Sequence, residues 1–147
     1  MLGFGPKAGV WIPTFPLNTD GIDPTATDVL IENVTITNFD DAVAVKPGQK
    51  DNKISKCAEN MLVRNLTVNY GIGLTIGSVP PSDNYHCVRN ITFSNIVFNH
   101  PIKAIYVKTN PGGTTSMLPG SGGEITNIVY ENIEIHFPIW WNIYIGP

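Results

Sequence analysis

Residues Asp28 to Ile36 read Asp-Val-Leu-Ile-Glu-Asn-Val-Thr-Ile, and this stretch sets the pattern of the whole chain. Its general form is Asp/Asn-Φ-x-Φ-x-Asn-Φ-x-Φ, where Φ is apolar and x is variable. The same pattern returns at residues 60–68, 90–98 and 127–135. The inner Asn of each copy falls at position 33, 65, 95 or 132, so the intervals are 32, 30 and 37 residues. A period of this size is typical of a repeat protein.

A second, shorter apolar pattern follows every copy. Its apolar pairs are Val43/Val45, Leu74/Ile76, Ile105/Val107 and Ile143/Ile145. β-Branched residues and turn formers dominate, and no stretch has the periodicity of an amphipathic helix. We therefore predict an all-β chain that forms a right-handed parallel β-helix of about four to five coils. A β-sandwich is the alternative.

Length and composition indicate one soluble globular domain. The 147 residues are 42% hydrophobic and 14% charged, and we assign residues 1–147 to a single β-helix domain. Residues 1–17 contain Pro6, Pro13 and Pro16, and we expect them to form an irregular lead-in without a regular strand.

Charge and hydropathy exclude two classes of partner. The formal net charge is −3 and the nine basic residues are scattered, which argues against a nucleic-acid surface. No apolar run approaches the roughly 20 residues of a membrane span. Residues 1–10 also lack the basic-then-apolar layout of a signal peptide. If the protein is secreted, we expect its targeting segment to be missing from this sequence.

The repeated Asn has two interpretations. An Asn at a coil corner can hydrogen-bond the same side chain one coil away. However, Asn33, Asn65 and Asn90 also lie in Asn-x-Thr sequons. The equivalent Asn95 and Asn132 have no sequon, so we favour a hydrogen-bonded ladder for Asn33 and Asn65. Asn90 is the better candidate for glycosylation.

The two cysteines occupy equivalent places in neighbouring copies. Cys57 and Cys87 each precede their repeat Asn by eight residues. Adjacent coils lie about 4.8 Å apart, within the roughly 4.4 to 6.8 Å between Cα atoms that a disulfide tolerates. We predict a disulfide, with two reduced thiols as the alternative. A disulfide would imply an oxidising compartment.

The apolar pairs give a register that brings three carboxylates together. If Ile22, Val43, Leu74 and Ile105 align, then the residues two positions earlier also align, namely Asp20, Asp41, Ile72 and Lys103. Asp40 adjoins Asp41. Like charges this close raise the pKa of at least one carboxyl, as a general acid requires. A solvated acidic turn or a calcium site is the alternative.

The same register predicts a groove beside the carboxylates. Lys46, Gly77 and Lys108 should form one outward column, and Ala44, Thr75, Tyr106 and Tyr144 the next. Lysines can hold an anionic substrate, while exposed rings such as those of Tyr106 and Tyr144 offer flat faces to sugars.

Four motifs resemble those of the polygalacturonase family of glycoside hydrolases, family 28, and the similarity runs from about residue 18 to residue 145. Residues 18–21 are Asn-Thr-Asp-Gly, and residues 40–46 are Asp-Asp-Ala-Val-Ala-Val-Lys. Residues 71–78 are similar to the family's Gly-His-Gly-Φ-Ser-Ile-Gly-Ser element, and Tyr106-Val107-Lys108 is similar to Arg-Ile-Lys. The family acts on pectic, uronate-containing polysaccharide and is secreted, so the resemblance implies a cell-wall polysaccharide as partner and no cofactor or metal.

The resemblance also implies roles for individual residues. Asp40 would protonate the glycosidic oxygen, and Asp20 and Asp41 would activate the attacking water. Asn18 and Lys108 would contact substrate. The family's single displacement inverts the anomeric centre, and inverting enzymes usually hold their carboxyl groups about 6.5 to 9.5 Å apart.

The sequence departs from the family at Ile72, where the family has His, and at Tyr106, where it has Arg. We expect Ile72 to desolvate Asp41 without giving it a partner, and Tyr106 to lack a planar fork for a carboxylate. Activity would then be reduced or altered. The alternatives are a non-catalytic carbohydrate-binding or structural β-helix and a metal-dependent lyase. With so few coils both ends should be open, so we also expect end-to-end self-association or the remainder of a longer chain.

Overall fold

The computed structural model describes residues 3–7, 10–14, 18–48, 57–79, 85–109 and 122–147. All regular elements in this part of the chain are strands. They are β1 (Gly3–Lys7), β2 (Val10–Thr14), β3 (Thr27–Asn38), β4 (Val43–Val45), β5 (Cys57–Tyr70), β6 (Ile72–Val79), β7 (Tyr85–Asn99), β8 (Lys103–Thr109), β9 (Gly122–His136) and β10 (Trp141–Gly146). None of the described residues forms a helix long and apolar enough to cross a membrane.

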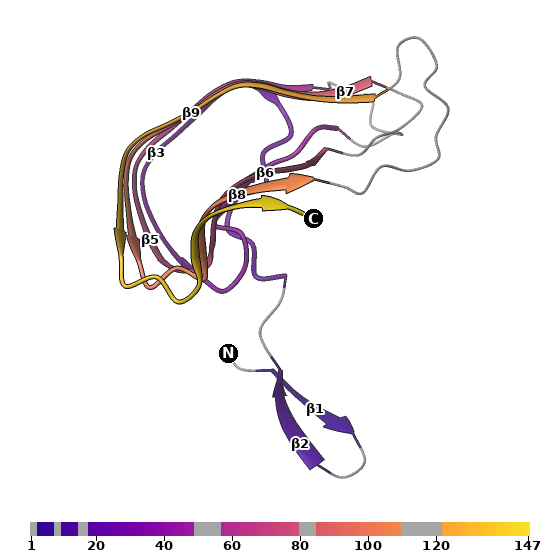
Figure 1. Ribbon diagram of the computed structural model, residues 1–147, viewed down its shortest axis with the longest axis vertical. Helices are drawn as coiled ribbons and strands as arrows, with labels where there is room; N and C mark the ends of the chain where they lie inside the picture. The colour runs from indigo at the N-terminus through magenta and orange to yellow at the C-terminus, as the bar shows by residue number, and fades with distance from the viewer. Residues whose placement is uncertain (1–2, 8–9, 15–17, 49–56, 80–84, 110–121) are drawn as a thin grey trace.

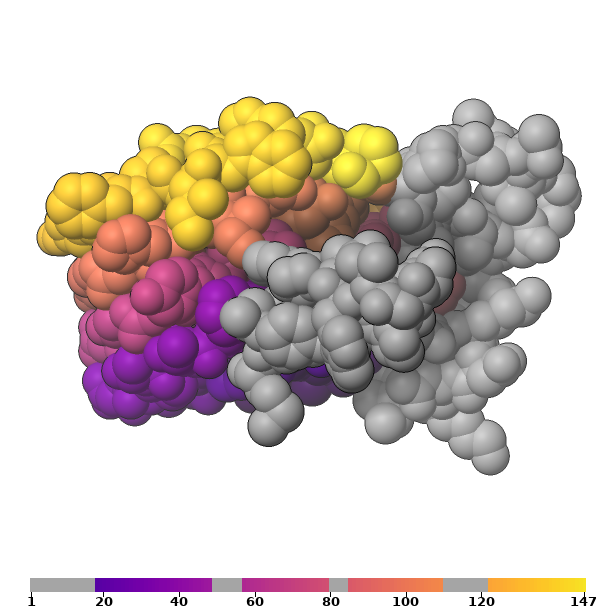
Figure 2. Space-filling view, turned by 90° about the horizontal axis from the view of Figure 1, so that it is seen from below, coloured from indigo at the N-terminus to yellow at the C-terminus, as the bar shows by residue number. Residues whose placement is uncertain are grey.

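The eight strands from β3 onward form a parallel β-helix. Long strands pair in the order β3-β5-β7-β9 and short strands in the order β10-β8-β6-β4, all in parallel. Each long strand and the short strand after it make one coil (Figure 1). The four coils lie on one another in chain order, as the successive colour layers of Figure 2 show. This confirms the predicted fold and assigns each repeat copy to one long strand.

The predicted register is also confirmed. Val43 pairs with Leu74, Leu74 with Ile105, and Ile105 with Ile143. Ile22 forms an isolated parallel bridge to Val43, so the chain before β3 joins the same column. The core between the two sheets is filled by side chains such as Val63, Leu74, Phe93 and Phe98, all fully buried.

Each long strand bends at the inner Asn of its repeat. Val63 and Leu66 are both buried, while Arg64 and Asn65 between them are both exposed. Two exposed residues in succession break the normal alternation of a strand. The break comes from a left-handed backbone conformation, which Asn tolerates better than most residues. The same conformation, with φ from 52° to 59°, occurs at Asp28, Asn33, Asn60, Asn65, Asn90, Asn95, Asn127 and Asn132.

These left-handed residues form two hydrogen-bonded ladders along the coils. In the predicted ladder, the side-chain amide of Asn65 donates to Asn33 at 3.2 Å, Asn95 donates to Asn65 at 3.4 Å, and Asn132 donates to Asn95 at 3.1 Å. Each of these three amides thus donates to the coil before it. Stacking of identical corners satisfies polar groups that one coil alone would leave without partners.

A second ladder, which we did not predict, uses the first residue of each copy. Asn60 donates to Asp28 at 3.0 Å, Asn90 to Asn60 at 2.8 Å, and Asn127 to Asn90 at 3.0 Å. Asn90 thus bonds to both neighbouring coils, as Asn65 does, so membership of a ladder does not distinguish Asn90 from the other two sequons. Glycosylation of Asn33, Asn65 and Asn90 stays a prediction.

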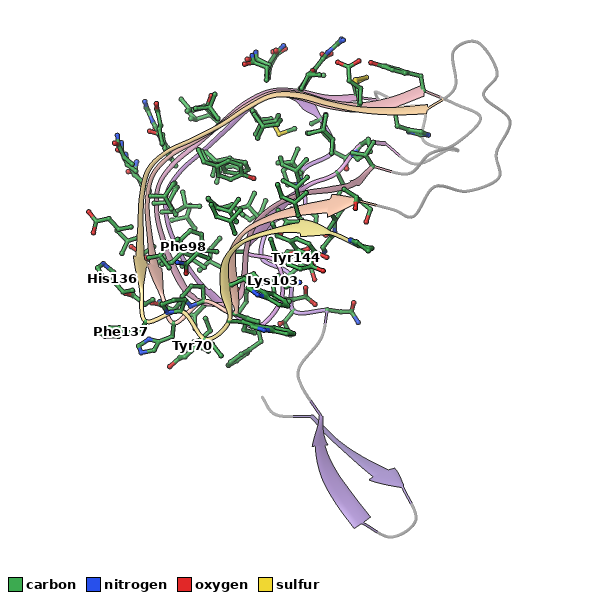
Figure 3. All side chains as sticks on the ribbon, viewed as in Figure 1. Tyr70, Phe98, Lys103, His136, Phe137 and Tyr144 are labelled. Carbon is green, nitrogen blue, oxygen red and sulfur yellow. A yellow bond between two sulfur atoms is a disulfide. The ribbon has the colours of Figure 1, made fainter. Side chains whose placement is uncertain are left out.

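Stacked aromatic rings from successive coils lie at the corner that precedes the short strands. Phe39 stacks on Tyr70 at 5.5 Å between centroids, Tyr70 on His100 at 6.0 Å, and His100 on Phe137 at 5.4 Å. Figure 3 shows Tyr70 and Phe137 together at this corner. Because Phe39 immediately precedes Asp40, the stack helps to fix where the chain turns into the carboxylate cluster.

A disulfide joins β5 to β7. Cys57 pairs with Cys87 in the sheet register, the two sulfurs are bonded, and the Cα atoms lie 4.4 Å apart. The bond links neighbouring coils at the start of their long strands.

The expectation of an irregular lead-in was wrong. Within residues 1–17, β1 and β2 form an antiparallel hairpin in which Phe4 pairs with Pro13 and Pro6 with Trp11. Each strand of a two-stranded hairpin has one free edge, where a proline's missing N–H breaks no ladder bond. Figure 1 shows this hairpin standing away from the coils.

The ladders predict unequal stabilities for two matched variants. Asn65 bonds to both neighbouring coils, whereas the described partner of Asn132 is Asn95 alone. Glycine keeps the left-handed backbone at either site and costs similar backbone entropy. At about 1 kcal/mol per hydrogen bond, Asn65→Gly should lower the free energy of unfolding by about 1 kcal/mol more than Asn132→Gly.

Urea unfolding of both variants, made in a host that does not glycosylate, measures this difference. Equal losses would contradict the ladder as a stabilising feature.

Candidate active site

Asp20 is placed by a short segment that runs along β4. The Gly21 N–H donates to the Asp41 carbonyl at 2.8 Å, and the Ile22 N–H donates to the Ala42 carbonyl at 3.0 Å. A Cβ at Gly21 would lie 2.4 Å from the Ala42 carbonyl oxygen, so only glycine permits this approach. The glycine after Asp20 therefore allows its carboxylate to lie beside Asp41.

Asn38 holds the turns that carry the carboxylates. Its buried side-chain amide donates to the Thr19 carbonyl at 3.0 Å and to the Asp41 carbonyl at 2.9 Å. Asp40 is fixed by its two oxygens, which accept from the backbone N–H of Asp41 at 2.9 Å and from that of Asn18 at 2.7 Å. Asn18, expected to contact substrate, thus contacts Asp40 through its backbone.

The structure brings Asp20, Asp40 and Asp41 together as the sequence predicted. One carboxylate oxygen from each lies within 4.8 Å of one from each of the others. These closest oxygens lie nearer than the roughly 6.5 to 9.5 Å that inverting enzymes usually keep between their carboxyl groups.

Asp41 is the buried member of the cluster, with a side chain only 1% exposed. The Thr75 hydroxyl donates to its Oδ1 at 2.6 Å, and Lys108 Nζ lies 2.5 Å from its Oδ2. Burial raises the pKa of Asp41, while the hydrogen bonds from Lys108 and Thr75 oppose that rise. The expectation that Asp41 lacks a partner because residue 72 is isoleucine was wrong.

Lys108 reaches Asp41 past an intervening glycine. Gly77 lies in β6, on the coil between those of Lys46 and Lys108, and a Cβ there would lie 2.6 Å from the Lys108 carbonyl oxygen and 3.3 Å from its Cβ. The absent side chain leaves space for the lysine. Lys108, expected to contact substrate, is paired with Asp41 here.

Lys46 pairs with the acidic residues of the Asp20 turn. Its Nζ lies 2.6 Å from Asp23 Oδ2 and 3.4 Å from Asp20 Oδ2. Burial lowers the pKa of Lys46, but the hydrogen bond and charge of Asp23 and the charge of Asp20 outweigh burial, so the net pKa is raised. Lys46 stays protonated and holds Asp20 by charge.

Tyr106 does not offer the exposed ring that the sequence suggested. It is only 7% exposed, because Tyr144 packs at 5.3 Å between ring centroids and Lys103 lies over it. The predicted column of Thr75, Tyr106 and Tyr144 is nevertheless correct in register.

Sequence reasoning missed the surroundings of Lys103. Its ammonium lies 4.0 Å from the Tyr106 ring centre and 4.2 Å from that of Tyr144, with Trp141 at 5.7 Å and Trp140 at 5.9 Å. Figure 3 shows Lys103 and Tyr144 beside one another. The only signal in the sequence was that Lys103 shares a column with Asp41. Thr75 was likewise placed in a column without being assigned as the partner of Asp41.

Comparison with known proteins identifies a matching family and several relatives. Residues 8–143 match the model of the glycosyl hydrolases family 28. The chain is 34% identical to a probable endopolygalacturonase D from Emericella nidulans, over 80% of the chain and 20% of the relative. It is 34% identical to a putative galacturan 1,4-alpha-galacturonidase A from Aspergillus flavus, over 89% of the chain and 30% of the relative. An exopolygalacturonase from Cochliobolus carbonum is 31% identical, over 80% of the chain and 26% of the relative.

The chain therefore belongs to family 28 of the glycosyl hydrolases. It spans between 20% and 30% of the length of these three relatives. No solved structure matches the chain significantly.

The buried Asp41 predicts a specific pH dependence of stability. Its pKa in the folded state is raised above the unfolded value of about 3.9. A carboxyl of this kind contributes stability that is fully present below the unfolded pKa and is lost as pH rises through the folded pKa. Asn has no proton to lose. Asp41→Asn should therefore gain stability relative to the parent as pH rises from about 3.5 to 7.

Parallel denaturant titrations across this range measure the change. A difference that stays constant, or that moves in favour of the parent, would contradict the raised pKa.

Proposed function

We propose that the chain carries the catalytic carboxylates of a glycoside hydrolase that cleaves pectic, uronate-containing polysaccharide. The observation that carries this proposal is the convergence of Asp20, Asp40 and Asp41 from two neighbouring segments, with oxygens within 4.8 Å. Membership of family 28 and the names of the matched relatives support the choice of substrate.

The reaction needs one group that gives a proton and another that takes one. Asp40 donates its proton to the glycosidic oxygen as the bond to the anomeric carbon breaks. Water attacks that carbon, and its proton passes to Asp41 or Asp20. The ammonium of Lys108 beside Asp41 opposes the burial that raises the pKa of Asp41, and the ammonium of Lys46 lies 3.4 Å from Asp20 Oδ2.

A non-catalytic carbohydrate-binding or structural role is the second candidate. Ile72 and Tyr106 favour it, since they stand where the motif resemblance implies His and Arg, and Tyr106 is buried. A metal-dependent lyase is distinguished from both candidates by loss of activity on addition of a chelator.

We further propose that the protein works outside the cell. The Cys57–Cys87 disulfide supports this, because structural disulfides persist in oxidising compartments.

Asp40→Asn tests the assignment of the general acid. The amide cannot donate the proton to the leaving oxygen, yet it keeps the shape of the side chain. We expect release of reducing ends from polygalacturonate to fall by at least about 100-fold, with affinity for the polymer little changed. Asp28→Asn is the matched control and should retain most of the activity, because Asp28 lies outside the cluster and an amide oxygen there can still accept from Asn60. Equal activity of Asp40→Asn and the parent would favour the binding or structural role.

The anomeric form of the first product tests the stereochemistry. We propose inversion from the family motif, although the close oxygens are nearer to the roughly 5 to 5.5 Å spacing of retaining enzymes. Proton NMR during the first minutes of hydrolysis should therefore detect the β-anomer from an α-linked polymer before mutarotation. An initial excess of the α-anomer would indicate a double displacement instead.

A further inference from the structure

Lys103 is a cation without a described counter-ion. Lys46 pairs with Asp20 and Asp23, and Lys108 pairs with Asp41. For Lys103, by contrast, no carboxylate of the described residues lies within ion-pair distance, and its described contacts are with aromatic rings. Ring faces attract the ammonium but leave its N–H donors without acceptors. These donors are available to an anion.

The rings hold this cation in place. Tyr106 and Tyr144 lie at about equal distances from the ammonium, 4.0 and 4.2 Å. Trp141 stacks on Tyr144 at 4.8 Å between centroids and on Trp140 at 4.1 Å. A lysine that is held among packed rings loses less side-chain entropy on binding than a free surface lysine does. Burial, followed by the nearby charge of Lys108, lowers the pKa of Lys103, and an incoming anion would relieve both effects.

The position of Lys103 relates it to the carboxylate cluster. Ile72 pairs with Lys103, and Lys103 pairs with Trp141. The Ile72 N–H donates to the Asp40 carbonyl at 2.8 Å. Lys103 therefore lies about two coil spacings, or roughly 10 Å, along the coil axis from the Asp40–Asp41 turn. A polymer that crosses the cluster along this axis would place a neighbouring sugar at Lys103.

An exposed ring beside Lys103 offers a surface for that sugar. Trp140 is 60% exposed, and its ring centre lies 5.9 Å from the Lys103 ammonium. A pyranose can stack on this ring while its exocyclic group points to the ammonium. Apolar stacking next to a fixed polar contact is the usual composition of a small-ligand site.

We propose that Lys103, held by Tyr106, Tyr144, Trp140 and Trp141, binds the carboxylate of one uronate unit of the polymer. This inference rests on the proposed function for the ligand class. In this proposal Lys103, on the coil after that of Ile72, distinguishes acidic from neutral sugars. In this arrangement Tyr106 holds the cation and does not itself contact the carboxylate.

The test compares affinity for charged and neutral forms of one ligand. Calorimetry measures binding of trigalacturonate and of its methyl ester, in an Asp40→Asn background so that neither is consumed. Lys103→Met should weaken binding of the acid by roughly 10- to 100-fold and leave binding of the ester unchanged. Lys103→Arg should restore most of the preference for the acid. Arg89→Met removes an exposed cation that pairs with Glu59 on the long-strand sheet, and it should change neither affinity.

Trp140→Ala separates stacking from charge recognition, because it should weaken binding of both ligands by a similar factor. If Lys103→Met does not fold, Lys103→Gln provides the same loss of charge with a polar side chain.

The outcomes distinguish this site from the proposed reaction. If the parent hydrolyses nothing but binds the acid through Lys103, the proposed hydrolase activity is contradicted and the anion site is supported. If the parent hydrolyses the polymer but Lys103→Met still prefers the acid to the ester as the parent does, the hydrolase activity is supported and the anion site is overturned. Failure of the Asp40→Asn protein to bind trigalacturonate at all would also overturn it.

Discussion

In-register stacking of one coil on the next is the constraint on which the rest of the structure depends. Each residue lies about one strand spacing, roughly 4.8 Å, from its equivalent in the neighbouring coil. A side-chain type repeated at one position therefore becomes a continuous row. The rows of apolar residues make the core, and the asparagine rows satisfy one another at corners where a single coil would leave amides without partners.

The carboxylate cluster uses the same constraint for a different purpose. Asp41 is on the first coil, Thr75 on the second and Lys108 on the third, so three successive coils assemble the surroundings of one carboxylate. A buried carboxylate without partners would cost several kcal/mol. The hydroxyl and the ammonium offset this cost, and the missing side chain of Gly77 leaves space for the lysine. Ile72 can therefore be isoleucine without leaving Asp41 isolated.

The last described coil exposes side chains of the core type. Ile143 is 61% exposed and Ile145 is 70% exposed, whereas their equivalents Leu74 and Ile76 are fully buried. Self-association and further coils of a longer chain remain proposals for what covers this face. If β3 of a second copy stacked on β9 in the same register, its Glu32 would lie beside Glu131, and like charges repel. Its Asp28 would lie beside Asn127, where the ladder needs an amide donor that an aspartate does not have. These contacts disfavour a simple stack of identical copies.

The sequence by itself determined the parallel β-helix, the pairing of coils and the meeting of Asp20, Asp40 and Asp41. It could do so because these features follow from a repeated pattern, and a repeat converts spacing along the chain into position in space. The hairpin of β1 and β2 was missed because it lies outside the repeat and contains prolines.

Only the tertiary structure decided which side chains contact one another across the columns. Register places Tyr106 in a row with Thr75 and Tyr144, but it does not say that Tyr144 covers Tyr106 or that Lys103 lies among their rings. It also did not assign Lys108 and Thr75 to Asp41. A register fixes backbone positions alone. Long side chains such as lysine span more than one coil, and their partners depend on rotamers and on local gaps such as Gly77, which no pattern of residue types specifies.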